Sequence, residues 1–263
     1  MIALAYDILF LKVNSLDLLP GTTFPVLANP AYVSRSQVFG SAEFGLYLFD
    51  TKFFSLYAQY SLMNSALKVY GGGSFRMLPA FEVVDPETSE TINFSYRDGY
   101  FLAGASYRLK DYVRLGGYFS LAYMGSTLES AFYPSISVGA EFPGRFFSAG
   151  FSIRNVVFGK WDALTLSGDF STLLYGDKSG KWDLYFSLLG MYSGYTGVVF
   201  TPSFLVRVLS FGVGVSTSLG AVAEKVTVSA SYRIPQGVSF GYSFGYSSVG
   251  QLLHRVFVVY QRG

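Results

Sequence analysis

Hydrophobic and polar residues alternate with a period of two along most of this chain. The pattern is clearest in residues 225–246, where the segment KVTVSASYRI puts apolar side chains on one face and mostly serine and threonine on the other. A turn at 235–237 follows, with a proline that fixes the backbone and a glycine that frees it. The return segment VSFGYSFGY repeats the alternation. This pattern predicts a β-hairpin with one apolar face and one face of small polar groups.

The same alternation predicts about fourteen strands across the rest of the chain. Their expected ranges are 36–49, 53–63, 66–76, 92–109, 112–124, 134–142, 146–158, 163–175, 181–192, 197–208, 210–219, 225–234, 237–248 and 253–261. Most of them reach the length of about ten residues that a tilted strand needs to cross a bilayer. Residues 1–34 do not alternate and contain several prolines, so we expect an irregular segment at 1–34 followed by a strand domain at 35–263.

The connections between the predicted strands differ in length in a regular way. Short turns are expected at 64–65, 110–111, 143–145, 209 and 235–237, and they alternate with longer connections at 77–91, 125–134, 219–224 and 248–252. Short turns at one end and longer loops at the other are typical of outer-membrane barrels. The longest uncharged run, 184–206, is interrupted by glycines and a proline and also alternates, so it predicts two strands and not a membrane helix.

Composition separates a membrane barrel from a soluble β-sandwich, which would also have one apolar face. Hydrophobic residues make up 51% of the chain and charged residues only 14%, whereas soluble domains contain about a quarter charged residues. Aromatic residues gather near the predicted strand ends, as in interfacial girdles; they are Tyr107, Tyr123, Phe142, Trp161, Trp182 and Tyr192. A sheet in lipid must close on itself, since an open edge would leave unpaired backbone groups.

These features predict an all-β fold, a single transmembrane antiparallel β-barrel of about fourteen strands in the bacterial outer membrane. The N-terminal irregular segment is expected to act as a plug. The net charge of +2 is too small to indicate nucleic acid as a partner. The absence of cysteine excludes disulfides and thiolate metal sites.

Two short motifs resemble the FadL/PorV family of outer-membrane proteins. Phe10-Leu11-Lys12-Val13 looks like the early F-L-K-[IV] segment of that family, and Ala28-Asn29-Pro30-Ala31 looks like its N-P-A motif ahead of the first strand. The resemblance implies a fourteen-stranded barrel, a plug that includes Phe10, Leu11, Asn29 and Pro30, and a side gate at a kinked third strand. FadL-type members admit hydrophobic substrates, and the PorV branch serves protein secretion as a partner barrel. This chain differs from the family in its short length and modest loops.

Most charged residues of the predicted strands fall on the inward face. We expect the following residues to line the lumen: Glu43, Gln59, Arg108, Arg114, Glu141, Arg154, Asp169, Asp183, Arg207 and Arg233. They form either a structural ion-pair network, a charged constriction, or a docking ring for the N-terminal segment. Arginine suits each role because its planar guanidinium makes paired hydrogen bonds.

Three consecutive glycines lie inside the predicted third strand. Gly71, Gly72 and Gly73 weaken a ladder and permit a bulge or bend. They predict either a device for strand curvature or a lateral gate at the position that the family resemblance indicates.

Enzymatic chemistry is not expected. The single histidine, His254, lies at the start of the last predicted strand, where an ordinary polar role suits it better than catalysis. We expect no cofactor and no metal; the acidic residues at 85–90 indicate a solvated loop.

Two functions therefore stay open. One is a passive conduit for hydrophobic or small molecules, which the sequence favours slightly. The other is a structural or secretion-partner barrel with a blocked lumen that binds other outer-membrane proteins. The expected partners are the lipid bilayer together with either a hydrophobic ligand or such proteins.

Overall fold

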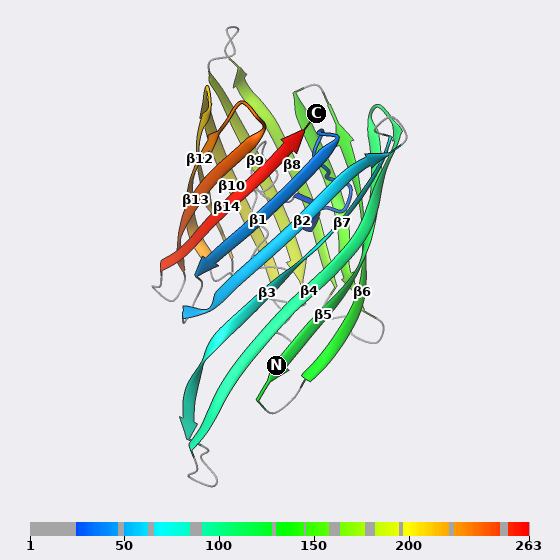
Figure 1. Ribbon diagram of the computed structural model, residues 1–263. Coiled ribbons are helices and arrows are strands. Elements are labelled where there is room, and N and C mark those ends of the chain that lie inside the picture. The colour runs from blue at the N-terminus through cyan, green and yellow to red at the C-terminus, as the bar shows by residue number, and fades with distance from the viewer. Residues whose placement is uncertain are drawn as a thin grey trace.

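The predicted strands pair in sequence order and close into a barrel. The computed structural model describes residues 25–46, 50–62, 66–84, 91–127, 130–144, 146–157, 164–176, 182–194, 197–220, 224–247 and 252–262. These residues form fourteen antiparallel strands, and β1 pairs with β14 to close the sheet (Figure 1). The predicted all-β barrel is confirmed. Within the described residues, no helix is long and apolar enough to span a bilayer.

The elements run in the following order. They are η2 (Pro25–Leu27), β1 (Val38–Leu46), β2 (Lys52–Leu62), β3 (Leu67–Val84), β4 (Thr91–Lys110), β5 (Val113–Ser126), β6 (Ser130–Pro143), β7 (Phe147–Val156), β8 (Thr165–Gly176), β9 (Trp182–Ser193), β10 (Gly197–Val208), β11 (Phe211–Thr217), β12 (Glu224–Arg233), β13 (Val238–Ser247) and β14 (Leu252–Arg262).

The predicted boundaries hold to within a few residues except at the end of β3 and the start of β6. We expected a loop at 77–91, but β3 continues to Val84, and the expected loop at 125–134 is mostly strand. Pairing of β3 with β4 continues because a register shift between Leu78 and Phe81 accommodates Pro79. An inward apolar cluster of Leu78, Phe94, Tyr96, Met124 and Tyr133 packs along this extension. The β3–β6 wall therefore extends beyond the rest of the barrel (Figure 1).

The barrel has two rims that differ in their connections. At the rim where β1 begins and β14 ends, the strands are joined through 63–66, 111–112, 144–146, 177–181, 209–210 and 234–237; we call it the turn rim. The opposite rim holds 47–51, 85–90, 127–129, 157–164, 194–196, 218–223 and 248–251; we call it the loop rim. All the short turns predicted from the sequence lie at the turn rim.

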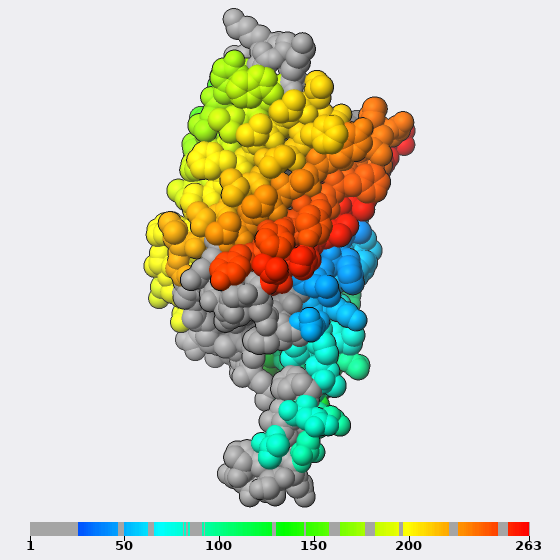
Figure 2. Space-filling model, turned by 90° about the vertical axis from the view of Figure 1, so that its left-hand side faces the viewer, coloured from blue at the N-terminus to red at the C-terminus, as the bar shows by residue number. Residues whose placement is uncertain are grey.

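Large apolar side chains cover the outside of the barrel. On β10–β14, the face that Figure 2 shows in yellow, orange and red, Phe204, Val213, Val228, Tyr242 and Val256 are each more than two-fifths exposed. Aromatic side chains concentrate at the turn rim, where Tyr107, Tyr112, Phe142, Phe147, Tyr175, Trp182, Phe211 and Tyr232 are exposed. An exposed apolar surface of this extent belongs in lipid, with the aromatic band at the membrane–water interface.

The lateral gate predicted at Gly71, Gly72 and Gly73 is wrong. All three glycines are paired on both sides, with Ala58 to Leu56 on β2 and with Ala103 to Phe101 on β4, without a shift in register. A Cβ at Gly72 would lie 2.5 Å from the Tyr57 ring and one at Gly73 would lie 2.9 Å from the Phe101 ring. Gly72 and Gly73 therefore make room for aromatic rings, and all three glycines lie in a continuous sheet.

The loop-rim part of the β10–β11 seam has a gap in its assigned ladder. The pairing runs from Val208↔Phe211 to Ser203↔Ser216, and beyond it the described residues form only the isolated bridge Phe200↔Leu219. Pro202 lies in this gap, and proline has no N–H to donate to a ladder.

The outward face of β4 offers a test of membrane depth. Phe101 is 72% exposed at the level of the middle of β2, whereas Asn93 points outward on the extension near Thr91. Phe101→Arg should cost about 2–4 kcal/mol of folding free energy, because it places a charge on the lipid face at mid-bilayer. Asn93→Arg should cost little. Urea titrations of both variants refolded into vesicles measure this; equal losses would contradict the assigned depth.

Candidate functional site

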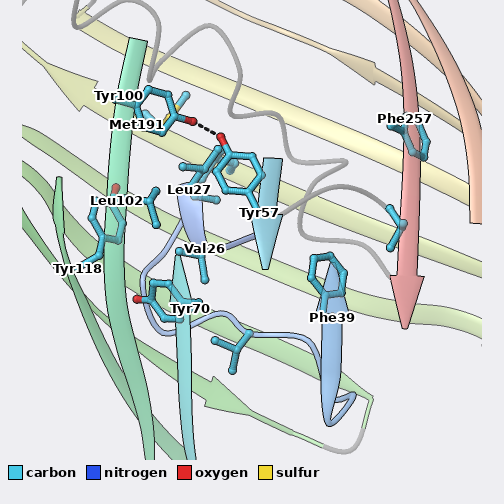
Figure 3. Packing of buried hydrophobic residues seen from close by; sticks show 14 of the residues in the cluster. Val26, Leu27, Phe39, Tyr57, Tyr70, Tyr100, Leu102, Tyr118, Met191 and Phe257 are labelled. Carbon is cyan, nitrogen blue, oxygen red and sulfur yellow. Dashed lines mark hydrogen bonds between the residues drawn. The ribbon is translucent and has the colours of Figure 1, made fainter. Parts of the chain in front are cut away.

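A non-strand segment occupies the lumen. Pro25–Ser36, which we call the inner segment, precedes β1 and lies inside the ring of strands (Figure 1). Val26, Ala28, Asn29 and Ala31 are completely buried. Val26 and Leu27 pack among Tyr70, Tyr100, Leu102 and Tyr118 from β3, β4 and β5 (Figure 3). The part of the barrel that would be a channel is therefore filled by the chain itself at this level.

The Asn29 side chain connects the inner segment to three strands through hydrogen bonds. Its Nδ2 group donates to the Ala140 carbonyl at 2.9 Å and lies 3.3 Å from both the Phe151 carbonyl and Asp169 Oδ2. Its Oδ1 accepts from the backbone N–H of Ala31 at 3.0 Å. One side chain thus joins β6, β7 and β8 to a turn of the inner segment.

Two buried charges face the inner segment from neighbouring strands. The Tyr32 hydroxyl donates to Asp169 Oδ1. Burial, followed by the negative charge of Asp169, raises the pKa of Tyr32, so this hydroxyl stays protonated and serves as a donor. Arg154 Nη1 donates to the Leu27 carbonyl. Because buried charges need partners, the segment contributes to the solvation of both an acidic and a basic side chain.

Side chains of the wall also satisfy the backbone carbonyls of the inner segment. The Tyr70 hydroxyl donates to Pro30 at 2.9 Å and the Ser106 hydroxyl donates to Ala31 at 3.2 Å. Ser152 and Ser167 donate to Ala28 at 3.2 and 3.4 Å. An irregular buried segment has no ladder partners, so these bonds replace them.

A second anchor holds the end of the inner segment near the turn rim. Gln59 accepts from the backbone N–H of Ser34 at 2.9 Å and donates to its carbonyl at 3.0 Å. Lys68 donates to the Ser34 carbonyl and, at 3.1 Å, to the Ser36 carbonyl. The ammonium of Lys68 is thus bound by backbone oxygens, and its side chain is buried.

Glycines of β5, β6 and β7 make room in the barrel wall for the Asn29-Pro30-Ala31 motif. A Cβ at Gly116 would lie 2.1 Å from the Pro30 carbonyl oxygen, and a Cβ at Gly139 would lie 2.1 Å from Asn29 Oδ1. A Cβ at Gly150 would lie 2.5 Å from Asn29 Nδ2. Only glycine fits at these three positions of β5, β6 and β7, which we call the glycine cradle. The wall and the motif are therefore complementary in shape.

The lumen is less polar than the sequence pattern suggested. We expected inward faces of small polar groups, but a buried apolar cluster also fills the interior (Figure 3). Besides Val26 and Leu27 it includes Phe39, Leu189, Met191, Val199, Phe257 and Val259 from β1, β9, β10 and β14. These residues point inward because they share the phase of buried serines and threonines on their strands, such as Ser41 and Thr201. The interior is thus a packed core as well as a polar one.

The sequence-predicted lumen residues occupy inward positions. Glu43, Gln59, Glu141, Arg154 and Asp169 are buried, and Arg114, Asp183 and Arg207 are partly buried. Arg108 and Arg233 keep the inward phase of their strands, but they lie at strand ends on the turn rim and are exposed. Two ion pairs join members of this set: Arg114 with Glu141 at 2.5 Å and Arg207 with Asp183 at 2.5 Å.

Sequence reasoning missed other interior charges. Lys68 anchors the inner segment, Arg255 lies 3.1 Å from Glu43, and Arg76 forms a buried pair with Asp98. Arg76 Nε lies 3.0–3.1 Å from both Asp98 oxygens, and Nη2 donates to Oδ2 at 2.6 Å. The strand phase was a usable signal, because Arg76 and Lys68 share the inward phase of Tyr70.

His254 of β14 lies beside Tyr242 of β13. His254 Nδ1 lies 2.6 Å from the Tyr242 hydroxyl, on an exposed part of the surface. No cluster of His, Cys, Asp and Glu side chains suited to a metal occurs among the residues that the structure describes. Phe10 and Leu11 of the predicted plug, Trp161, and the acidic residues at 85–90 lie outside the described residues.

Substitution in the glycine cradle should release the inner segment. Gly139→Ala puts a methyl group 2.1 Å from Asn29 Oδ1. Loss of the Asn29 hydrogen bonds, about 1.5–3 kcal/mol, should make the open state about tenfold more populated or more. The chain has no cysteine, so an Ala28→Cys reporter reads this out as the rate of maleimide labelling.

Gly168→Ala is the matched control, because a Cβ there would meet nothing within 4 Å. It should leave the labelling rate unchanged. Similar labelling of the two variants would mean that the cradle does not hold the segment.

The Arg76–Asp98 pair should be sensitive to loss of one partner. Asp98→Ala leaves the Arg76 guanidinium buried and should cost about 3–5 kcal/mol of unfolding free energy. The double variant R76A/D98A should cost less than the two single variants together. Unfolding by urea in vesicles measures the coupling, and additive losses would show that the two groups are independent.

Solved structures that resemble this chain are outer-membrane barrels. Omp33 of Acinetobacter baumannii superposes with a TM-score of 0.54 at 9% identity, covering 86% of this chain and 98% of that protein. A double mutant of the Rh. blastica porin gives 0.48 at 11% identity, covering 85% and 98%. The KdgM porin gives 0.46 at 12% identity, covering 86% and 99%. The likeness to Omp33 supports the barrel fold.

Sequence comparison adds the family. No curated protein matches the chain. The family model described as type IX secretion system membrane protein PorP/SprF matches residues 120–253, which is about half of the chain and runs from β5 to β14. Together with the closed barrel and its apolar outer surface, this match places the protein in the bacterial outer membrane. The chain belongs to the PorP/SprF family of membrane proteins.

Proposed function

We propose that this protein is a closed partner barrel of the type IX secretion system, which works by binding other secretion proteins in the outer membrane. The family description supports a role in secretion. The glycine cradle is the observation that favours a closed barrel over an open conduit. Gly116, Gly139 and Gly150 lie on three different strands. A side chain at Gly116 would collide with Pro30, and side chains at Gly139 and Gly150 would collide with Asn29.

Many hydrogen bonds and apolar contacts hold the inner segment in the lumen, which favours a fixed segment over a mobile gate. It is hydrogen-bonded to side chains of β2, β3, β4, β7 and β8, and its apolar residues join the buried core of the lumen. Opening a path for solute would unpair these groups and also uncover Arg154 and Asp169. The conduit that the sequence slightly favoured therefore has less support than the secretion-partner barrel.

Purification from native outer membranes tests the proposal. The intact protein should retain a type IX secretion protein as a stoichiometric partner and should contain no apolar ligand in the lumen. Mass spectrometry of the bound proteins and lipids, taken from the same preparation, distinguishes the two functions. A bound lipid without a partner protein would support the conduit instead.

Conductance provides the second test. The intact barrel should show little single-channel current in planar bilayers, because the inner segment fills the lumen. Deletion of residues 1–36 should leave a folded barrel with a clearly higher conductance. Unchanged conductance after the deletion would mean that the segment does not close the lumen.

A further inference from the structure

Positive charge is concentrated at the turn rim. Within three residues of the strand ends at this rim, the described residues include eight basic side chains and three acidic ones. The basic residues are Arg35, Lys68, Arg108, Lys110, Arg114, Arg207, Arg233 and Arg262; the acidic residues are Asp111, Glu141 and Asp183. This surplus exceeds the net charge of +2 of the whole chain.

The loop rim has no such surplus. By the same criterion, its described side chains are balanced: Lys52, Arg154 and Arg255 against Glu43, Asp50 and Glu82. Among the described side chains, the two ends of the barrel thus differ in net charge. A difference of this kind produces an electrostatic field at one mouth that attracts an oppositely charged partner.

Four arginines of the turn rim occupy inward positions on β4, β5, β10 and β12, and a fifth lies near the end of the inner segment; we call these five residues the arginine ring. They are Arg35, Arg108, Arg114, Arg207 and Arg233. Arg108 and Arg114 are register partners on β4 and β5, and Arg114 is the register partner of Glu141 on β6, so the three side chains share the inward face. Arg35 belongs to the inner segment, and its exposed side chain interacts electrostatically with Glu141 on β6 and with Tyr185 on β9.

Three members of the ring have binding capacity left. Arg114 and Arg207 are already paired with Glu141 and Asp183. Arg35, Arg108 and Arg233 are exposed, and the described part of the chain provides no ion pair to any of them. The two existing pairs show which group the ring accepts, a carboxylate, and the planar guanidinium favours such a bidentate acceptor.

We propose that the arginine ring docks an acidic segment of a periplasmic polypeptide over the turn-rim mouth. This rests on the proposed function and adds the place and chemistry of one docking surface. The short turns assign this rim to the periplasmic side. Lipid phosphate suits the ring less well, because its side chains point toward the barrel axis. Lys110, at the end of β4, lies instead over the exposed ring of Tyr112.

Binding of a short fluorescent Glu-Ser repeat peptide to the barrel in phosphatidylcholine nanodiscs tests the proposal. The wild-type barrel should bind this peptide and not the matched Gln-Ser peptide, and binding should weaken as salt screens the charges. The triple variant R35Q/R108Q/R233Q should weaken binding about tenfold or more, because three charge-assisted contacts with carboxylates are lost. Undiminished binding to this variant would overturn the proposal.

Two further variants make the result specific. K52Q/R97Q removes two exposed cations that lie away from the turn rim and should bind the Glu-Ser peptide like the wild type. The charge reversal R35E/R108E/R233E should bind a Lys-Ser peptide instead, which a merely misfolded barrel would not do. Equal losses in K52Q/R97Q and R35Q/R108Q/R233Q would reduce the effect to net charge and contradict a docking ring.

Other outcomes separate this proposal from the proposed function. If wild-type membranes yield a secretion partner and R35Q/R108Q/R233Q yields it equally, the arginine ring is not the docking surface and the partner barrel stands. If the peptide results hold but no secretion partner is found, the ring stands and the partner barrel fails. Phosphatidylglycerol that co-purifies with the wild-type barrel and is lost from R35Q/R108Q/R233Q would assign the ring to lipid phosphate and overturn the proposal.

Discussion

The hydrogen bonds between the inner segment and the inward side chains of the wall are the interactions on which the filled interior of the barrel depends. A sheet in lipid must close, and its closure leaves an interior that either fills with water or is filled by protein. Here an irregular segment fills it, and such a segment has no ladder partners of its own. Serine, tyrosine, glutamine and lysine side chains of the strands therefore supply the missing donors and acceptors.

This constraint also explains the mixture of residues on the inward face. Val26 and Leu27 need apolar neighbours, and they find them in Tyr100 and Leu102; Asn29 and Tyr32 need a polar neighbour, and they find it in Asp169. The glycines of β5, β6 and β7 remove side chains where the motif lies closest to the wall. This filled interior is the feature on which the proposed function as a closed partner barrel rests.

Strand phase accounts for what could be predicted from the sequence. Side chains alternate between lipid and lumen, so a period of two gives both the strands and the inward direction of residues such as Glu141 and Arg154. The extension of β3 was not predictable in this way. Pro79 ends a simple alternation, and only the register shift that accommodates it lets pairing with β4 continue to Val84.

Contacts across the lumen could not be predicted from the sequence either. Asn29 and Asp169 are 140 positions apart, and the N-P-A motif alone does not say which strand faces it. The glycines at 71–73 were interpreted either as a device for strand curvature or as a lateral gate, whereas the rings of Tyr57 and Phe101 lie where side chains at Gly72 and Gly73 would be. Glycine has several uses, and only the surroundings distinguish them.

Hydrogen exchange of the intact protein in membranes tests the closed lumen most directly. The backbone N–H groups of Ala31, Tyr32, Ser34 and Ser36 are all hydrogen-bonded. Peptides that cover residues 25–36 should therefore exchange slowly, at rates comparable to those of the barrel strands. Exchange of these peptides as fast as that of exposed turns, such as 235–237, would contradict a segment locked inside the barrel.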